Sequence, residues 1–434
     1  MRIKHSKIAG LAALGLTVAL VAGACGGNGD AAAPTPDASP TDEAPTPEPD
    51  PTEDAPPTRA DADLVIWTDD VRAGALTDAA VAWGEANGLT VAVQAISGPL
   101  QDLFITADSL GNGPDLVIGA HDWVGNLVQN GSIVPVVVPD TSDFVPEAIA
   151  AATFQGQLFG VPYATETIGL FANNALTADP APATMEALVA AAEAGVDGNV
   201  ADNVLCLQIG NAGDPFHMQP LFTSGGGAIF GMNDDGTWNG SDVQVGSDGS
   251  VAAAEKIGAL GAAGVLSTSI DGSNSIPLFA DGNCAYLVSG PWALAQIAAI
   301  DYSLAAIPPF ADGGPALAPG GVQMFFVAAN GANQAMAQAF VGDIATGTDV
   351  TAAMFAIDHR PPAQMSLADK VAGEFPDLAT FGQLFANAQP MPAIPQMSAV
   401  WGPLGQAQAQ IVDGADPAST IKGAAEAIVT AIGG

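Results

Sequence analysis

The stretch that decides the fold begins LVIWTDDVRAGAL (residues 64–76) and ends PDLVIGAHDW (residues 114–123). Short apolar runs predict strands over 64–67, 89–95 and 116–120. Between them, segments with apolar side chains on one side predict helices over 73–86 and 100–110. Strands and helices that alternate at this spacing favour an α/β fold built on parallel sheets covered by helices.

The alternation returns further along the chain, with predicted helices over 185–193 and 250–260 and predicted strands over 203–208 and 285–289. Sheets of this kind bind ligands in the loops after the carboxyl ends of their strands. Polar and aromatic side chains stand at two such places. Asp70 and Arg72 follow the first strand, and Asp122 and Trp123 follow the strand 116–120. These four residues are therefore candidates for a binding site.

The charge balance excludes several partners. The 434 residues include 9 Lys and Arg against 46 Asp and Glu, a formal net charge of −37. So acidic a chain repels the phosphates of nucleic acids, and we expect no nucleic-acid partner. The same charge disfavours electrostatic attachment to anionic lipid. It is typical of a surface that carboxylates keep soluble outside the cell.

The N-terminus predicts export and a lipid anchor. Arg2, Lys4 and Lys7 precede 17 uncharged residues that end at Ala24, the pattern of a signal peptide over residues 1–24. The Val-Ala-Gly-Ala-Cys that closes this segment resembles a bacterial lipobox, in which Cys25 would be acylated. The alternative is an ordinary cleaved signal followed by a chance cysteine. Residues 25–62, with nine Pro and nine Asp or Glu, read as a disordered tether that holds a folded body away from the membrane.

No metal or cofactor is expected. Four scattered histidines make no zinc pattern, and the chain has no Walker-type phosphate loop and no Gly-x-Ser-x-Gly elbow. The acidic loop 234–240 lacks the rest of an EF-hand. Cys206 and Cys284 both lie in apolar, strand-like runs, so a disulfide and two buried free thiols both remain open.

Six sequence blocks follow one another in the order seen in one protein family. They are Leu64–Trp67; Gly113–Asp115 with Ala120–Asp122; Gly156 and Gly160–Pro162 with Glu166; Asp214–Phe216 with Pro220 and Leu221; Gly290–Ala293; and Met391, Pro392 and Ile394–Ala399 with Trp401. The chain resembles the extracellular solute-binding proteins of carbohydrate ABC transporters, and most closely those that bind maltose or maltodextrin.

The resemblance implies a two-lobed, periplasmic-binding-protein-like α/β fold with hinge-crossing strands and a cleft between the lobes. One lobe would comprise 63–165 plus 322–366, and the other 167–320 plus 367–434. It also implies a monomeric receptor, not an enzyme, that stands lipid-anchored on the outer face of the cell membrane. Such a receptor delivers an oligosaccharide to membrane permease subunits of the transporter.

The resemblance further implies a sugar site. Carboxylates accept pairs of sugar hydroxyls, and aromatic side chains cover the apolar face of a sugar ring. The matching positions are Asp122, Glu166, Asp214, Phe216, Trp292 and Trp401, with Trp123 as an additional wall. Asp70 and Arg72 join this set because they follow the first predicted strand. The chain departs from the family at four positions: Gly119 stands where a Trp is frequent, Trp123 and Gly405 each stand where an Arg is frequent, and Phe216 replaces a Tyr.

Each site residue also has a structural interpretation: a helix cap for Asp122, a solvated loop for Asp70 and Arg72, a surface charge for Glu166, a turn for Asp214, and core packing for the tryptophans. Two other functions remain open beside the receptor. A secreted glycoside hydrolase would use two of the carboxylates as acid and base. A receptor of the same fold could bind a polyamine in an acidic cleft, whereas iron is disfavoured because the three tyrosines are not adjacent in sequence.

Overall fold

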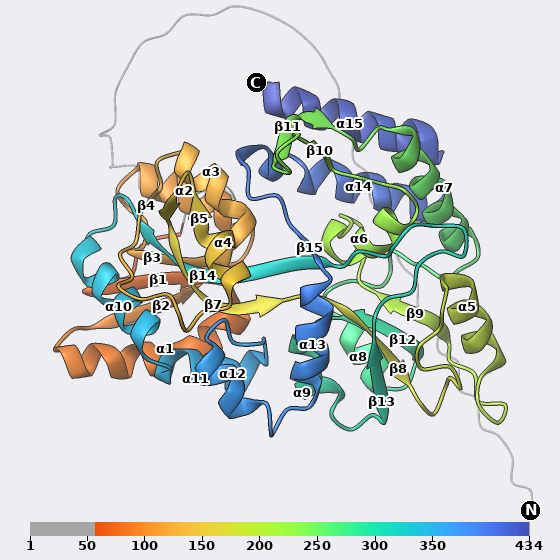
Figure 1. Ribbon diagram of the computed structural model, residues 1–434, viewed down its shortest axis with the longest axis horizontal. Coiled ribbons are helices and arrows are strands. Elements are labelled where there is room, and N and C mark those ends of the chain that lie inside the picture. The colour runs from red at the N-terminus through yellow and green to blue at the C-terminus, as the bar shows by residue number, and fades with distance from the viewer. Residues whose placement is uncertain (1–56, 434) are drawn as a thin grey trace, which may run out of the picture. The chain divides into compact units, whose positions relative to one another are not determined.

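Two larger β-sheets organise the part of the chain that the computed structural model describes, residues 57–433 (Figure 1). The described residues belong to one compact unit. The predicted signal peptide 1–24, Cys25 and the tether up to residue 56 lie outside the described residues.

The first sheet has the strand order β15-β14-β3-β1-β2, and β4 and β7 also pair with β14. Its strands are β1 (Leu64–Thr68), β2 (Val91–Ala95), β3 (Leu116–Ala120), β4 (Ile133–Val134), β7 (Gly160–Glu166), β14 (Pro319–Ala328) and β15 (Gln389–Pro390). As predicted, β1 is parallel to β2 and β3. The prediction of a parallel sheet holds for these three strands, but the sheet as a whole is mixed, because β14 follows β13 of the second sheet and runs antiparallel to β3 and β7.

Helices pack around this sheet: α1 (Asp70–Asn87), α2 (Leu100–Ser109), α3 (Val124–Gln129), α4 (Pro146–Ala152), α10 (Gln334–Thr346) and α11 (Asp349–Asp358). A short hairpin is formed by β5 (Thr153–Phe154) and β6 (Gln157–Leu158). Trp67, Phe104, Phe325 and Phe340 are completely buried in the hydrophobic core of this part. The predicted helix 73–86 begins earlier, because Asp69 caps it by accepting a hydrogen bond from the Arg72 N–H at 2.9 Å.

The second sheet has the order β13-β8-β12-β9. Its strands are β8 (Gly169–Asn173), β9 (Asn203–Leu207), β12 (Cys284–Ser289) and β13 (Tyr302–Ala305), and the hairpin β10 (Phe230–Met232) and β11 (Trp238–Val243) lies apart from it. Its helices are α5 (Met185–Ala194), α6 (Pro215–Ser224), α7 (Asp248–Ala262), α8 (Ser275–Ala280), α9 (Leu294–Ile297), α13 (Asp377–Ala386), α14 (Trp401–Val412) and α15 (Pro417–Gly433). A disulfide joins Cys206 to Cys284 across β9 and β12, with the Cα atoms 5.8 Å apart.

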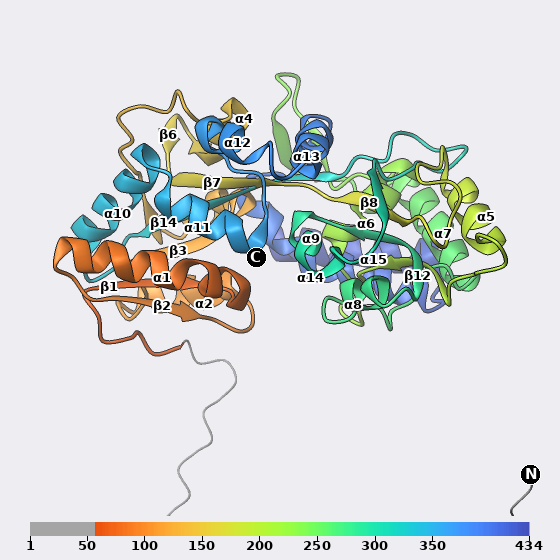
Figure 2. The same ribbon diagram turned by 90° about the horizontal axis from the view of Figure 1, so that it is seen from below.

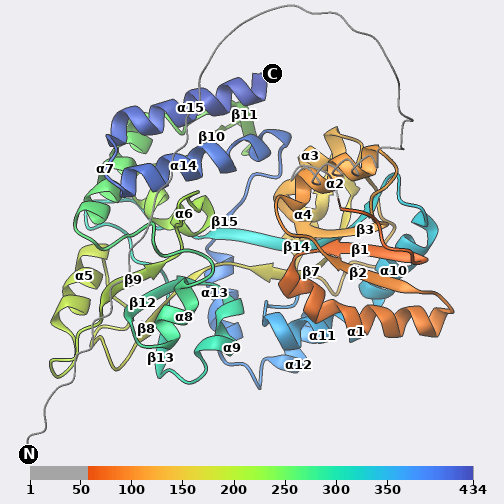
Figure 3. The ribbon, with the colours of Figure 1, turned by 180° about the vertical axis from the view of Figure 1, so that it is seen from behind.

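The chain passes between the two sheets three times. Only residues 167–168 separate β7 of the first sheet from β8 of the second, and β13 of the second sheet leads back to β14 of the first. The last passage follows α12 (Met365–Val371) and α13 into β15, and then into the 3-10 helix η3 (Pro395–Ala399). Figures 2 and 3 show β7 and β14 lying between the two groups of elements. The predicted lobe boundaries stay a prediction.

Among residues 57–433, no single helix is both long and apolar enough to cross a bilayer. The α10–α11 pair passes the same length and composition criteria only when the two helices are taken together, and they meet at a bend of 76°.

Candidate functional site

In each sheet, one strand is followed by a tryptophan whose ring packs directly against a glycine four or two residues earlier in the chain. After β3, the 3-10 helix η1 (His121–Trp123) folds the Trp123 ring over Gly119, and a Cβ built on that glycine lies 2.2 Å from a ring carbon. After β12, η2 (Pro291–Ala293) places the Trp292 ring over Gly290 with the same 2.2 Å spacing. A larger side chain at either glycine would displace the ring. The ring of Trp123 therefore takes the space in which a side chain at position 119 would lie.

Asp122 is a buried carboxylate with one oxygen left free of protein partners. Its exposed fraction is 4%, and its Oδ2 accepts a hydrogen bond of 3.2 Å from the indole N–H of Trp401. The buried Oδ1 has no hydrogen-bond partner. Burial raises the pKa of this carboxyl to about 7, although the Trp401 hydrogen bond opposes the shift. Buried polar atoms nearly always have a hydrogen-bond partner, so this free oxygen suits a hydrogen-bond donor from a ligand.

Glu166, at the end of β7, is bound on both carboxylate oxygens. Oε1 accepts from the Gln323 side-chain amide at 2.6 Å, and Oε2 pairs with Nε of Arg360 at 2.7 Å. Burial opposes ionisation of Glu166. The positive charges of Arg360 and Arg72, together with the hydrogen bonds from Arg360 and Gln323, outweigh it and hold the pKa below its usual value. The Arg360 guanidinium also lies 4.9 Å from the centre of the Trp292 ring, within range of a cation–π contact.

Arg72 joins the same network from the first turn of α1. Its Nε donates to the Tyr163 hydroxyl at 2.9 Å, and it forms an ion pair with Asp69. The Tyr163 hydroxyl is also 3.5 Å from Asp358, whose carboxylate pairs with Arg360 at 3.2 Å. Asp70, by contrast, is exposed at the start of α1.

Asp214 and Phe216 lie at the start of α6, next to Trp292. Asp214 caps this helix through the His217 N–H at 3.0 Å, and its carboxylate is also bound by the His217 ring and by Gln208. Burial acts against ionisation here too, but the contacts with His217 and the hydrogen bond from Gln208 together outweigh it and hold the pKa of Asp214 below its usual value. The Phe216 ring centre is 6.5 Å from that of Trp292.

Packing explains why a glycine stands at position 405. A Cβ built there lies 2.8 Å from the Ala212 carbonyl oxygen, and one built on Gly213 lies 1.8 Å from the Gly405 carbonyl oxygen. The loop before α6 therefore rests directly on α14. No arginine side chain fits in that space.

The structure thus links most of the predicted residues into two groups. The first holds Arg72, Glu166, Trp292, Phe216 and Asp214, and the second holds Asp122 with Trp401. Asp70 lies outside both groups. The sequence prediction missed Arg360, Tyr163 and Asp358. Arg360 carries a usable signal, because it is one of only four arginines in the chain.

Two α/β sheets joined by three passages of the chain, with acidic and aromatic side chains contributed from both, define a two-part α/β binding protein. The sequence matches the pattern described as bacterial extracellular solute-binding protein over residues 78–381. The chain belongs to this family, whose members are receptors and not enzymes.

Comparison with individual proteins agrees with this assignment. A maltotriose-binding protein of Pyrococcus abyssi is 29% identical over 315 residues, 70% of this chain and 66% of that protein. A galactooligosaccharide-binding protein of Bacillus subtilis is 27% identical, over 84% of this chain and 88% of that protein. A maltooligosaccharide ABC transporter solute-binding lipoprotein of Streptococcus pneumoniae is 26% identical, over 82% and 86%.

A solved structure confirms the predicted fold class. The Thermus thermophilus maltotriose binding protein bound with maltotriose superposes with a TM-score of 0.75 at 26% identity, covering 85% of this chain and all of that one. The predicted family is also confirmed, whereas the individual site residues stay predictions.

Proposed function

We propose that this protein is the oligosaccharide receptor of an ABC importer and that its ligand is a maltooligosaccharide. Three of the similar proteins described above are named for maltotriose or maltooligosaccharide, and one for galactooligosaccharide. The observation that carries the proposal is the free Oδ1 of Asp122, beside Trp401. A buried carboxylate oxygen that lacks a donor suits a sugar hydroxyl.

In this proposal the two parts of the protein supply different contacts. Asp122 and Trp123 from the first sheet, together with Trp401, receive one end of the sugar chain. Trp292 and Phe216 supply aromatic surface for another ring, with Glu166 and Asp214 nearby. Asp70 and Arg72 complete the predicted set. Sugar that contacts both parts stabilises a closed arrangement of the hinge, because it binds that state more tightly than the open one.

The proposal includes the predicted location. Acylation of Cys25 anchors the receptor to the outer face of the membrane, and the tether presents the folded body to permease subunits. Cys25 lies outside the described residues, so this part depends on the sequence alone. Metabolic labelling with a fatty-acid probe, compared between the full-length protein and Cys25→Ala, tests it. Labelling that persists in the variant refutes the anchor.

A polyamine receptor is less consistent with the charges at this site. Glu166 is already paired with Arg360, and Asp214 is bound by His217 and Gln208. Among the described Asp and Glu residues, Asp122 alone has a buried oxygen without a partner. One free carboxylate oxygen fits hydroxyl groups better than a chain of several ammonium groups.

Calorimetry with maltotriose and with a galactooligosaccharide tests the ligand, and one pair of variants tests the site. Trp401→Phe removes the N–H that binds Asp122, and we expect maltotriose affinity to fall at least tenfold. Trp83→Phe is the matched control, since Trp83 likewise donates its indole N–H to an aspartate, Asp343, at 2.7 Å, but its ring packs against Phe340 and the hydrophobic core. Equal effects of the two variants, or no heat with either sugar, refute the proposal.

A further inference from the structure

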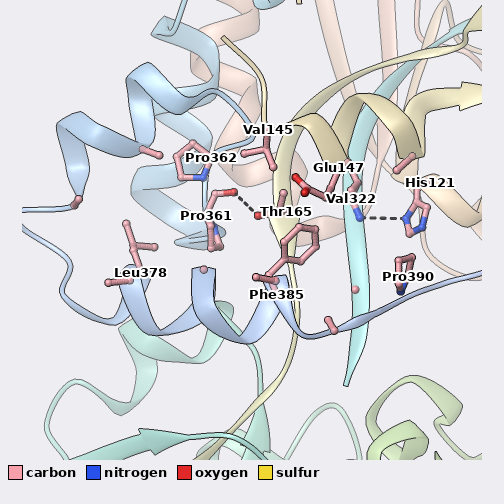
Figure 4. A pocket seen from close by; sticks show the side chains of 18 of the residues that line it. His121, Val145, Glu147, Thr165, Val322, Pro361, Pro362, Leu378, Phe385 and Pro390 are labelled. Atoms are coloured by element: carbon pink, nitrogen blue, oxygen red, sulfur yellow. Dashed lines mark hydrogen bonds between the residues drawn. The ribbon is translucent and has the colours of Figure 1, made fainter. Parts of the chain in front are cut away.

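A cavity of about 520 Å3 lies beside the passages between the two sheets (Figure 4). We call it the hinge pocket. Its walls come from α4, β7, β14, α12 and α13, and so from elements that pack with both sheets. Most of its lining is apolar and includes Val145, Val322, Pro361, Pro362, Leu378 and Phe385.

The charged groups that line the hinge pocket are negative. Glu147 on α4 and Asp369 on α12 are both exposed, and the lining contains no Lys or Arg. The lining histidine, His121, is already engaged: Nδ1 accepts from the Val322 N–H at 3.1 Å, and Nε2 donates to the Met391 carbonyl at 3.2 Å. Burial lowers the pKa of His121 to about 4, so the ring is neutral near pH 7. An apolar wall with carboxylates beside it suits an apolar body that carries a cation.

The hinge pocket and the candidate sugar site lie back to back. In β7, Thr165 lines the pocket whereas the next residue, Glu166, binds Arg360 on the site side. Successive side chains of a strand point to opposite faces, so these two must diverge. Two further neighbouring pairs are divided between the pocket and the site. His121 and Pro361 line the pocket, whereas Asp122 and Arg360, next to them in the chain, belong to the site. The Thr165 N–H donates to the Pro361 carbonyl at 2.8 Å, which ties two of these walls together.

We propose that the hinge pocket binds a small amphipathic organic cation and that its occupancy changes the sugar affinity of the site behind it. A ligand bound between α4 and α13 would contact β7 and β14 and restrain their movement, and β7 also carries Glu166 of the site. Any such coupling is reciprocal: the sugar must change the affinity of the cation by the same factor, and typical factors are about 5 to 150. The coupling rests on the proposed function, whereas binding of the cation does not.

Three probes with the same alkyl chain test the pocket without sugar: hexylammonium, hexanol and hexanoate, each titrated into the intact folded body by calorimetry. We expect affinity to fall in that order. Glu147→Gln combined with Asp369→Asn should reduce hexylammonium affinity at least fivefold and leave hexanol unchanged. The matched control is Glu193→Gln with Glu426→Gln, which alters the net charge equally on exposed positions of α5 and α15.

A filling variant tests the location of the probe. A Cβ at Gly382 on α13 meets no atom within 4 Å, so Gly382→Phe should place a ring in the hinge pocket without disturbing the fold. It should abolish binding of hexylammonium and hexanol, with an unchanged melting temperature as the check on folding. Binding that survives in this variant, or an equal loss in the control pair, overturns the proposed site.

The coupling is measured last. Maltotriose affinity is determined with and without saturating hexylammonium, and hexylammonium affinity with and without maltotriose. Two equal factors of at least threefold support the proposal, and a factor of one overturns the coupling. If maltotriose does not bind at all, the proposed function fails, while the probe series still decides whether the hinge pocket is a cation site.

Discussion

Sugar affinity should depend on pH through Asp122. Its carboxyl is buried, has one free oxygen, and has a pKa raised by burial to about 7. Sugar hydroxyls donate hydrogen bonds to the ionised form, so binding favours deprotonation. Below pH 7 the ionised fraction falls about tenfold per pH unit. Relative to the fully ionised protein, binding at a pH of about 5.5 should therefore be roughly 30-fold weaker, a loss of about 2 kcal/mol.

The other ionisable groups of the site do not follow this course. The pKa values of Glu166 and Asp214 are held low, and that of His121 is lowered to about 4, so all three keep their charge state over this range. His217 contacts Asp214 and lies next to Trp292, and therefore needs its own control.

The assay is calorimetric titration with maltotriose at several pH values in two buffers of different ionisation enthalpy, so that the released proton is counted. Asp122→Asn should bind more weakly at pH 8 and lose most of the pH dependence, whereas His217→Gln should keep it. A flat pH profile in the parent protein refutes the reasoning. So does a profile that survives in Asp122→Asn and disappears in His217→Gln.

The sugar-free protein should show the opposite trend. The pKa of Asp122 is raised in the folded state above its ordinary value of 3.8, so the folded state binds this proton more readily than the unfolded state. Its contribution to stability is complete below pH about 4 and is lost as the pH rises through about 7. Melting curves of the parent and Asp122→Asn at several pH values isolate this contribution from that of the other groups.

Three further outcomes are expected. In Gly290→Ala the added Cβ would lie 2.2 Å from carbons of the Trp292 ring, so the ring should tilt and sugar binding should weaken at least tenfold in a fluorescence titration. Gly402→Ala, whose added Cβ meets open space, should bind sugar normally in the same titration. Arg360→Gln leaves a buried carboxylate without its cation and should lower the free energy of unfolding by about 3 kcal/mol in urea, whereas Lys256→Gln, whose partner is exposed, should cost less than about 1 kcal/mol. The disulfide between β9 and β12 joins cysteines 78 residues apart, and its reduction should lower the free energy of unfolding by roughly 4 kcal/mol. An unchanged midpoint of urea unfolding after reduction contradicts this prediction.

Local sequence patterns closely predicted the helices and strands at the start of the first sheet, between residues 64 and 120. The apolar run 116–120 forms β3, and the predicted helix 100–110 forms α2 over Leu100–Ser109. Both depend on neighbours a few residues away, which is the range over which periodicity and capping act. The strand order was not accessible in this way, because the antiparallel β14 joins residues about 200 positions apart, such as Gln323 and Ala120.

By itself, the sequence determined the α/β class and the family, since these follow from local pattern and ordered motifs. Only the tertiary structure decided that Arg360 pairs with Glu166, 194 residues away, and covers one face of Trp292. Only packing showed that Cys206 meets Cys284, and that position 405 has no room for a side chain. Contacts of this kind depend on how distant segments pack, and no local pattern in the chain encodes them.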